Sequence, residues 1–246
     1  AANTMVNVEQ ITLAAGFSYN LTTNDANVAA GQTLTVNASA LGSGNTLTFN
    51  GAAETDGVFV INGGAGNDTI TGGGGNDIIR PGSGNDTINA GGGNATIIGG
   101  AGNDLIQIAD RGQPGGSAFI SLSGEDTVRL WGGTVSMVNT TSQDALAKIQ
   151  INSGENRVTV DGAARFDING GTNTIFSDGG AFTVTGGTST VTVSGSSADI
   201  VKTGDTQLDL TLQSPQPGHY DLKGDMTIHQ TAEGRYRLEL DGNDTV

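Results

Sequence analysis

A nine-residue repeat is the feature that most constrains this chain. It runs without a slip through five copies: GGAGNDTIT (63–71), GGGGNDIIR (72–80), PGSGNDTIN (81–89), AGGGNATII (90–98) and GGAGNDLIQ (99–107). Each copy joins a six-residue, glycine-rich turn to three residues that favour a β-strand. A short fixed period of this kind predicts that the chain winds into stacked coils instead of folding around a thick core.

One aliphatic side chain per copy is expected to point inward from the three-residue strand. The inward set is Ile70, Ile79, Ile88, Ile97 and Ile106, with Ile61 one period upstream. Stacked coils would align these side chains into a ladder. One buried isoleucine per nine residues offsets only part of the entropy that is lost when the turn becomes ordered, so another interaction has to stabilise the turns.

Aspartate at the sixth position of the repeat provides that interaction. It is present in four copies, as Asp68, Asp77, Asp86 and Asp104. Stacked without a cation, these carboxylates would lie about one strand spacing, roughly 4.8 Å, apart and would repel one another. Carboxylate oxygens together with turn carbonyl oxygens are ligands that suit Ca²⁺. The sequence therefore predicts calcium sites in the turns.

The repeats fit the pattern GGxGxDxUx, in which U is a large aliphatic residue, and the stretch resembles the RTX, or haemolysin-type, calcium-binding repeat family. The resemblance implies a parallel β-roll in which two repeats make one coil and each ion lies between a turn and the next but one. Asp68, Asp86 and Asp104 would then share one edge, called here the odd edge. Asp77 would be followed by Ala95 and Gln113 on the other, the even edge. We expect two ions on the odd edge and at most one on the even edge.

The candidate calcium-binding residues combine these aspartates with the turn glycines. The full set is Gly63, Gly64, Gly66, Asp68, Gly72, Gly73, Gly75, Asp77, Gly82, Gly84, Asp86, Gly99, Gly100, Gly102, Asp104 and Asp126. Pro81 and Ala90 replace the first glycine of two copies without changing the register. Asp126, in SGEDTVR (123–129), lies out of the nine-residue register after an insertion around residues 111–116. We therefore expect it to form an isolated calcium turn.

Degenerate forms of the same pattern continue on both sides of the repeats. Alternating runs that predict strands occur at 33–39, 46–51, 118–122, 126–130, 148–152, 156–160, 165–170, 182–187, 189–195, 207–210, 220–224 and 237–242. The expected fold is all-β, a parallel β-roll or β-solenoid through most of the chain. Its parts are N-terminal solenoid coils (1–62), the calcium-binding β-roll (63–107) and a C-terminal solenoid (108–246).

Two further segments carry separate expectations. SQDALAK (142–148) predicts a short helical excursion, and DGNDTV (241–246) is interpreted as the start of another repeat or the tail of a type I secretion signal. No stretch has the length and hydrophobicity of a membrane span, and no N-terminal signal peptide is evident. By resemblance, the chain would be exported in one step and would act outside the cell or at its surface.

Composition and the lack of catalytic motifs argue against several classes of function. A formal net charge of −15 repels nucleic acid, and the chain has no cysteine for disulfides. His219 and His229 do not have metal-ligand spacing, and no nucleophile or nucleotide-binding motif occurs. Three aspartates, Asp161, Asp167 and Asp178, fit a polysaccharide-cleaving face, but turn positions explain them equally well.

The sequence therefore predicts a non-catalytic, secreted, calcium-binding structural or adhesive protein, similar to RTX surface-layer, fibre and biofilm-matrix proteins. Exposed ends of a solenoid favour a homo-oligomer, filament or lattice. Cell-surface polysaccharide is the other expected partner, and Trp131 and Tyr220 are the aromatic residues to test for contact with a ligand. The alternative is a non-catalytic RTX calcium-folding module of a larger type I secreted toxin or enzyme.

Overall fold

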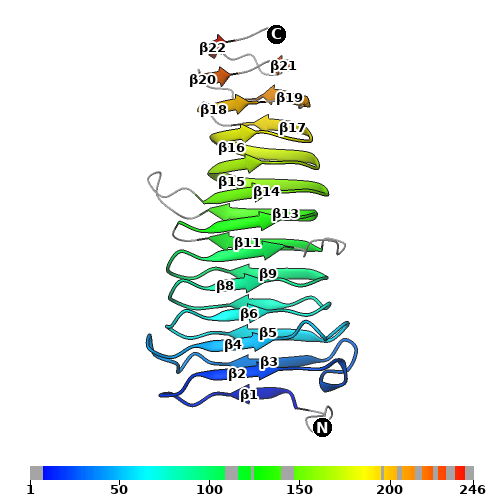
Figure 1. Cartoon of the computed structure of the whole chain (residues 1–246), viewed down its shortest axis with the longest axis vertical. Helices are drawn as coiled ribbons and strands as arrows, with labels where there is room; N and C mark the ends of the chain where they lie inside the picture. The colour runs from blue at the N-terminus through cyan, green and yellow to red at the C-terminus, as the bar shows by residue number, and fades with distance from the viewer. Residues whose placement is uncertain are drawn as a thin grey trace.

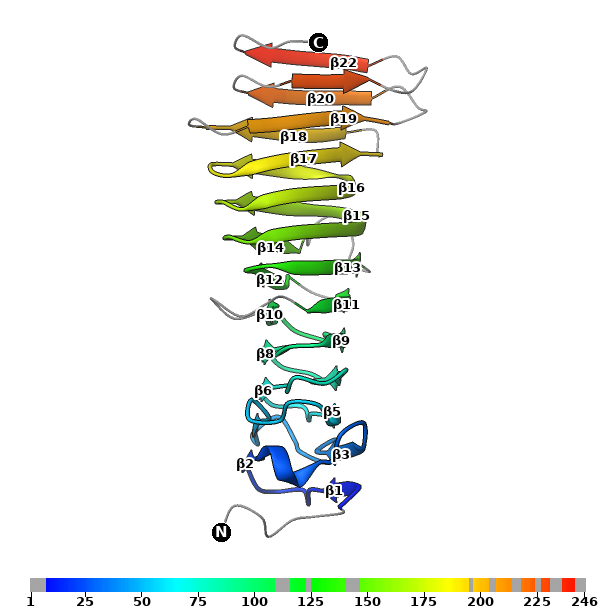
Figure 2. The ribbon, with the colours of Figure 1, turned by 90° about the vertical axis from the view of Figure 1, so that its right-hand side faces the viewer.

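The computed structural model describes residues 8–108, 116–122, 125–139, 147–194, 197–203, 207–213, 218–223, 227–230 and 236–241. These residues form 22 β-strands and one short 3-10 helix, η1 (Asp25–Asn27), and no α-helix occurs among them. The strands lie across the long axis of an elongated stack, with the N-terminus at one end and the C-terminus at the other (Figures 1 and 2). The expected β-solenoid is confirmed.

The strands are short in the repeats and longer towards the C-terminus. The N-terminal part contains β1 (Gln10–Thr12), β2 (Tyr19–Thr22), β3 (Thr33–Asn37), β4 (Leu47–Asn50) and β5 (Val58–Asn62). The repeats contain β6 (Thr69–Thr71), β7 (Ile78–Arg80), β8 (Thr87–Asn89), β9 (Asn94–Ile98) and β10 (Leu105–Ile108). They are followed by β11 (Ser117–Leu122), β12 (Thr127–Leu130), β13 (Gly133–Asn139), β14 (Lys148–Ile151), β15 (Glu155–Ile168), β16 (Thr172–Val184), β17 (Thr188–Val193), β18 (Ser197–Lys202), β19 (Gln207–Leu212), β20 (Gly218–Lys223), β21 (Thr227–Gln230) and β22 (Tyr236–Asp241).

Two parallel ladders face each other across a thin core. Each strand of the repeats pairs with the next but one, as in β6 with β8 and β7 with β9, so two strands make one coil. Figure 2 shows β6, β8 and β10 on one side and β5, β9 and β11 on the other. The long strands β15 and β16 bend and contribute to both ladders, with an irregular step between Val160 and Ala163 in β15.

The predicted isoleucine ladder fills the space between the two sheets. Ile61, Ile70, Ile79, Ile88, Ile97 and Ile106 are all fully buried. The pairing register aligns Ile70 with Ile88 and Ile88 with Ile106, so like side chains stack along the axis. Because each three-residue strand points only one side chain inward, this part of the core is one aliphatic residue thick on each side.

The flanking coils have larger core side chains. Phe49 and Phe59 pack edge to face below the repeats, with ring centroids 5.0 Å apart. Phe166 and Phe182 stack in parallel above them at 4.4 Å. A buried ladder of polar side chains also links the upper turns: Asn156 donates to Asn173, which donates to the Ser189 hydroxyl. These coils therefore contain stabilising contacts that the repeats lack.

Every run predicted as a strand on either side of the repeats overlaps a strand of the structure, although some runs, such as 182–187, extend beyond the strand end. Three of the sequence-based expectations fall wholly or partly outside the described residues: the helical excursion (142–146), the C-terminal segment (242–246) and Gln113. Within the described chain, no helix has the length and apolar character needed to cross a membrane. Strand pairing continues across the two expected boundaries, between residues 62 and 63 and between residues 107 and 108. The division of the chain into three parts stays a prediction.

Candidate metal centre

A column of buried aspartates follows the odd edge. Asp68, Asp86, Asp104 and Asp126 each precede a strand of the same ladder, and each is at most 2% exposed. Leu105 of β10 pairs with Thr127 of β12, which places Asp126 directly after Asp104 in the column. The expectation that Asp126 forms an isolated turn is therefore wrong. Asp126 follows Asp104 after 22 residues, whereas the earlier neighbours in the column are 18 apart, yet the strands keep their register.

Backbone amides fix one oxygen of every carboxylate in this column. The Oδ1 atom of each aspartate accepts a hydrogen bond from an N–H group one coil earlier: Leu47 to Asp68 at 2.7 Å, Asp68 to Asp86 at 2.7 Å, Asp86 to Asp104 at 2.9 Å and Asp104 to Asp126 at 2.8 Å. Each carboxylate thus connects two coils. Because the bonds fix the orientation of the group, the second oxygen is held in place as well.

The second carboxylate oxygen, Oδ2, has a hydrogen-bond partner at the start of the column but not in its middle. Asp68 Oδ2 accepts a hydrogen bond from the Gly64 N–H at 2.8 Å. In contrast, Asp86 Oδ2 and Asp104 Oδ2 are buried and have no hydrogen-bond partner. Buried carboxylate oxygens without a partner are costly in a folded protein. These two atoms are therefore available to coordinate a cation, and the donor set fits Ca²⁺.

A cluster of oxygen atoms surrounds Gly99. A Cβ atom added to Gly99 would lie 3.3 Å from Asp104 Oδ2, 3.4 Å from the Ser121 carbonyl oxygen and 3.7 Å from Asp126 Oδ2. Two carboxylate oxygens and a carbonyl oxygen, which accepts the Gly99 N–H at 2.9 Å, thus lie around the space that a side chain at position 99 would occupy. The position of the Ser121 carbonyl was not predicted, because the place of a main-chain oxygen depends on the strand register and leaves no mark in the side-chain pattern.

Burial changes the protonation of these carboxylates. Desolvation raises the pKa of Asp86 to about 6, opposed by its hydrogen bond from the Asp68 N–H and assisted by the Asp68 charge. Desolvation also raises the pKa of Asp104 to about 7, and the charges of Asp126 and Asp86 add to it. The pKa of Asp68 is raised by burial too. The protein alone therefore does not stabilise the ionised form of these carboxylates, which a bound cation would favour.

The even edge is different. Asp77 accepts hydrogen bonds from the Phe59 N–H at 2.8 Å and the Gly73 N–H at 2.7 Å, so both of its oxygens have partners. Strand pairing places Ala95 next and then Ala118, which pairs with Ala95. The expectation of Gln113 at this place is thus wrong, because the insertion moves the following strand by several residues. No second carboxylate follows Asp77 in the described part of this column.

Turn glycines meet two different structural requirements. Gly82, Gly84, Gly100 and Gly102 have positive φ, as expected, and a Cβ on Gly102 would collide with the Gly84 carbonyl oxygen. The first two copies differ, because their glycines have φ outside the left-handed region. There the stacking distance requires glycine: a Cβ on Gly66 would collide with the Asn45 carbonyl oxygen. Gly63 and Gly72 similarly leave room beside the carboxylates of Asp68 and Asp77.

The other sequence candidates are not brought together. Asp161 lies in the half of β15 that pairs with β13, whereas Asp167 pairs with β14 and forms an ion pair with Lys148 at 2.8 Å. Asp178 accepts a hydrogen bond from Ser194 at 2.6 Å. His219 and His229 are in different ladders, and their side chains lie outside the described structure. Of the two aromatic residues to test for ligand contact, Tyr220 is fully buried and therefore inaccessible.

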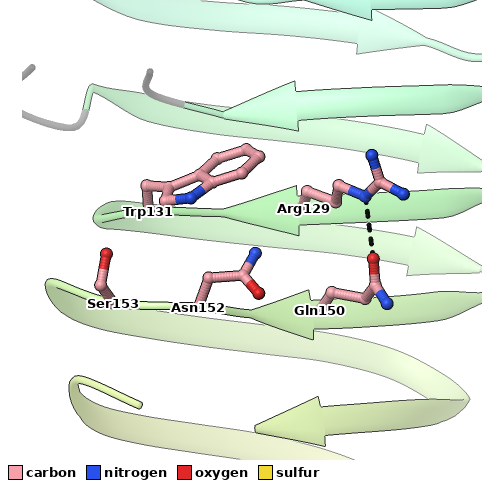
Figure 3. Close-up of a pocket in the computed structure, with 5 residues that line it drawn as sticks. All are labelled: Arg129, Trp131, Gln150, Asn152 and Ser153. Carbon is pink, nitrogen blue, oxygen red and sulfur yellow. Dashed lines mark hydrogen bonds between the residues drawn. The ribbon is translucent and has the colours of Figure 1, made fainter. Parts of the chain in front are cut away.

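Trp131 lies in a surface recess. The recess has a volume of about 480 Å³ and is lined by Arg129, Trp131, Gln150, Asn152 and Ser153. Figure 3 shows these side chains projecting from the same face of two neighbouring coils. Arg129 Nε donates a hydrogen bond to Gln150 Oε1 at 2.8 Å, which holds both groups beside the indole.

Comparison with known proteins identifies the repeats. The family model of the RTX calcium-binding nonapeptide repeat matches residues 60–88 and 89–107, with four copies. No curated protein and no solved structure gave a significant match to the chain. The matched residues contain Asp68, Asp77, Asp86 and Asp104, which the structure divides between two edges. Residues 60–107 are therefore a run of RTX calcium-binding repeats, folded as a parallel β-roll.

Proposed function

We propose that this is a secreted, non-catalytic structural or adhesive protein whose β-roll folds when it meets extracellular calcium. The proposal depends above all on Asp86 and Asp104, whose second oxygens are buried without a partner. Four stacked aspartates on the odd edge give three intervals between neighbouring carboxylates. The sequence-based expectation of two ions on this edge therefore becomes three.

The thin core explains why calcium is needed. The repeats bury one isoleucine per three-residue strand, and the ionised carboxylates repel one another along the column. Bound Ca²⁺ supplies the opposing charge, so its binding free energy contributes directly to folding. Extracellular calcium modules have dissociation constants on the order of 10⁻⁴ to 10⁻³ M. The roll would stay unfolded in a calcium-poor cytosol, which suits export of an unfolded chain.

Assembly is supported by the two ends of the stack. Among the described strands, β1 and β2 pair on one side only, with β3 and β4. At the other end, β21 and β22 pair only with β19 and β20. Unpaired strand edges can add a strand from a second copy. We therefore favour end-to-end association into filaments or lattices.

Adhesion is favoured by the Trp131 recess. An aromatic face beside planar hydrogen-bonding groups is suited to a sugar ring, and the Arg129 guanidinium suits an acidic sugar. The ligand would be a cell-surface polysaccharide whose acidic groups reach the Arg129 guanidinium, since the net charge of −15 repels a polyanion elsewhere on the surface. Trp131 is the only tryptophan, so its fluorescence reports on this recess directly. A saturable change with an acidic polysaccharide, absent with a neutral one of the same length, is the expected result.

The alternative function is a calcium-folding module of a larger secreted toxin or enzyme. Sequencing the gene around this chain separates the two: a neighbouring catalytic domain favours the module, and further solenoid coils favour the structural protein.

The proposal is tested by hydrogen exchange and electron microscopy of the full chain, with calcium and in excess chelator. Amides of Ile70, Ile79, Ile88 and Ile106 should exchange slowly with calcium and fast without it, and filaments or lattices should disappear on chelation. Slow exchange in chelator would contradict calcium-dependent folding. A monodisperse monomer in calcium would contradict assembly.

A further inference from the structure

A second group of carboxylates lies below the repeats, at the N-terminal end of the roll. Carboxylate oxygens of Asp25, Glu54 and Asp56 lie within 4.8 Å of one another. Asp25 begins η1, whereas Glu54 and Asp56 belong to the loop between β4 and β5. Asp25 and Asp56 are exposed, but Glu54 is only 1% exposed. None of the three occupies the aspartate position of a nine-residue repeat.

Glu54 is the residue that needs explanation. Its Oε1 atom accepts a hydrogen bond from the Gly57 N–H at 3.0 Å. Its Oε2 atom is buried and has no hydrogen-bond partner. The ion pairs found among the described residues do not include Glu54. A glutamate is rarely buried to this extent unless an opposite charge or a metal ion accompanies it.

The surroundings of Glu54 increase the local negative charge. Besides Asp25 and Asp56, the even-edge carboxylate of Asp77 is close: burial is the main cause that raises the pKa of Asp77, and the Glu54 charge adds to it. Four carboxylates thus lie around one end of the even edge, where the repeats supply no second aspartate.

Hydrogen bonds hold the two segments of the cluster in place. Asp25 Oδ1 accepts bonds from the Thr55 N–H at 3.0 Å and the Thr55 hydroxyl at 2.6 Å. The Gly31 N–H donates to the Asp56 carbonyl oxygen at 3.0 Å. Gly57 packs so closely on Val28 that a Cβ at Gly57 would lie 2.7 Å from the valine side chain. The carboxylates are therefore brought together by the fold, from segments about 30 residues apart.

We propose that Asp25, Glu54 and Asp56 bind a Ca²⁺ ion at a site separate from the nine-residue repeats. Three carboxylates on two separate segments match the oxygen-rich, irregular coordination that Ca²⁺ accepts and that Mg²⁺ disfavours. The ion provides a partner for the buried Oε2 atom. It also links η1 to the loop before β5, and so closes the first coil below the roll.

The test compares the full-length wild-type chain with Glu54→Gln, which keeps the shape of the side chain, and with Asp25→Asn. Glu155→Gln is the matched control, because Glu155 is exposed and lies far along the stack in β15. Bound calcium is counted by equilibrium dialysis with elemental analysis. Hydrogen exchange follows the amides of Thr55 and Gly57, and those of Ile88 and Ile106 in the roll.

Glu54→Gln is expected to bind one calcium ion fewer than wild type and to lose the calcium-induced protection of Thr55 and Gly57, while Ile88 and Ile106 respond normally. Asp25→Asn should weaken binding at the same site by about tenfold or more, and Glu155→Gln should match wild type. Unchanged stoichiometry in Glu54→Gln overturns the proposal. The proposal is also overturned if Asp77→Asn loses this ion while Asp25→Asn still binds it. The ion would then belong to the even-edge turn.

The outcome is separate from calcium binding by the repeats. If the repeats bind no calcium, the wild-type chain still binds one ion that Glu54→Gln removes, and Thr55 and Gly57 still gain protection. If the repeats bind calcium and this site does not, only Ile88 and Ile106 respond.

Discussion

Replacing Asp104 by asparagine should change stability in opposite directions with and without calcium. Asp104 lies inside the odd-edge column, between Asp86 and Asp126. Without calcium its negative charge is buried and repelled by its neighbours, so removing the charge should stabilise the fold. With calcium the same charge binds the ion, so removing it should weaken binding. Asparagine retains an oxygen that can accept the Asp86 N–H.

The size of the first effect follows from the pKa of Asp104, which is raised from 3.8 to about 7. At about 1.4 kcal/mol per pKa unit, the ionised side chain destabilises the calcium-free fold by roughly 4 kcal/mol at neutral pH. The buried amide that Asp104→Asn introduces has one group without a partner, which costs about 1–3 kcal/mol. The net gain expected in calcium-free buffer is therefore about 1–3 kcal/mol.

The assay is hydrogen exchange of the Ile88 and Ile106 amides at pH 7.5, combined with a calcium titration. Asp104→Asn should exchange more slowly than wild type without calcium, and its calcium midpoint should rise by about tenfold or more. Asp161→Asn is the matched control, because Asp161 is exposed, and it should change neither value. Faster exchange of Asp104→Asn in calcium-free buffer would refute the electrostatic reasoning, and an unchanged midpoint would refute the assignment of the site.

Three further predictions test other parts of the site. Asp86→Ala should impair calcium-dependent folding more than Asp77→Ala, because Asp77 has no carboxylate after it on the described even edge. Equal losses of the circular dichroism signal in the two variants would contradict the two-edge arrangement. In calcium-free buffer the roll should gain structure as the pH falls from about 7 towards 4. The pKa values of Asp86 and Asp104 are raised in the folded state, so these carboxylates take up protons at a higher pH when folded than when unfolded, and this uptake stabilises the fold. A loss of structure in that range, or the same pH response in Asp104→Asn, would argue against this. Gly99→Ala should reduce bound calcium by one ion with little change in calcium-free stability, because the methyl group fills the space among the three oxygens; normal stoichiometry by dialysis would place the ion elsewhere.

Much of the fold was predictable because the period is strict. Nine residues with one inward isoleucine fix both the strand and its partner, and the degenerate runs keep the same alternation. The placement of Asp126 was not predictable, because the length of an insertion does not show how much of it loops out. Glu54 was missed for a related reason: its loop has no repeat pattern, and its proximity to Asp25 arises only when distant segments pack together. Tyr220 was named as a candidate for ligand contact, but it lies in the inward-facing column that runs from Asp126 through the small residues Ala147, Ala164, Gly180 and Ala198 and continues to Leu238.

The pairing of each strand with the next but one has a consequence for how such a chain can change in length. A loss or gain of 18 residues removes or adds one whole turn of the spiral and leaves every later residue on its original side. A change of half that length would move all later strands to the opposite side, so the coils before and after the junction would meet out of phase. Without residues 81–89, for example, Asp68 would face Ala95, whereas Asp104 and Asp126 would follow Asp77. Genes for such proteins should therefore lengthen or shorten in even numbers of repeats, and in designed variants that differ by a single repeat the aspartates on the two sides of the junction should fall on different edges although every repeat in them is intact.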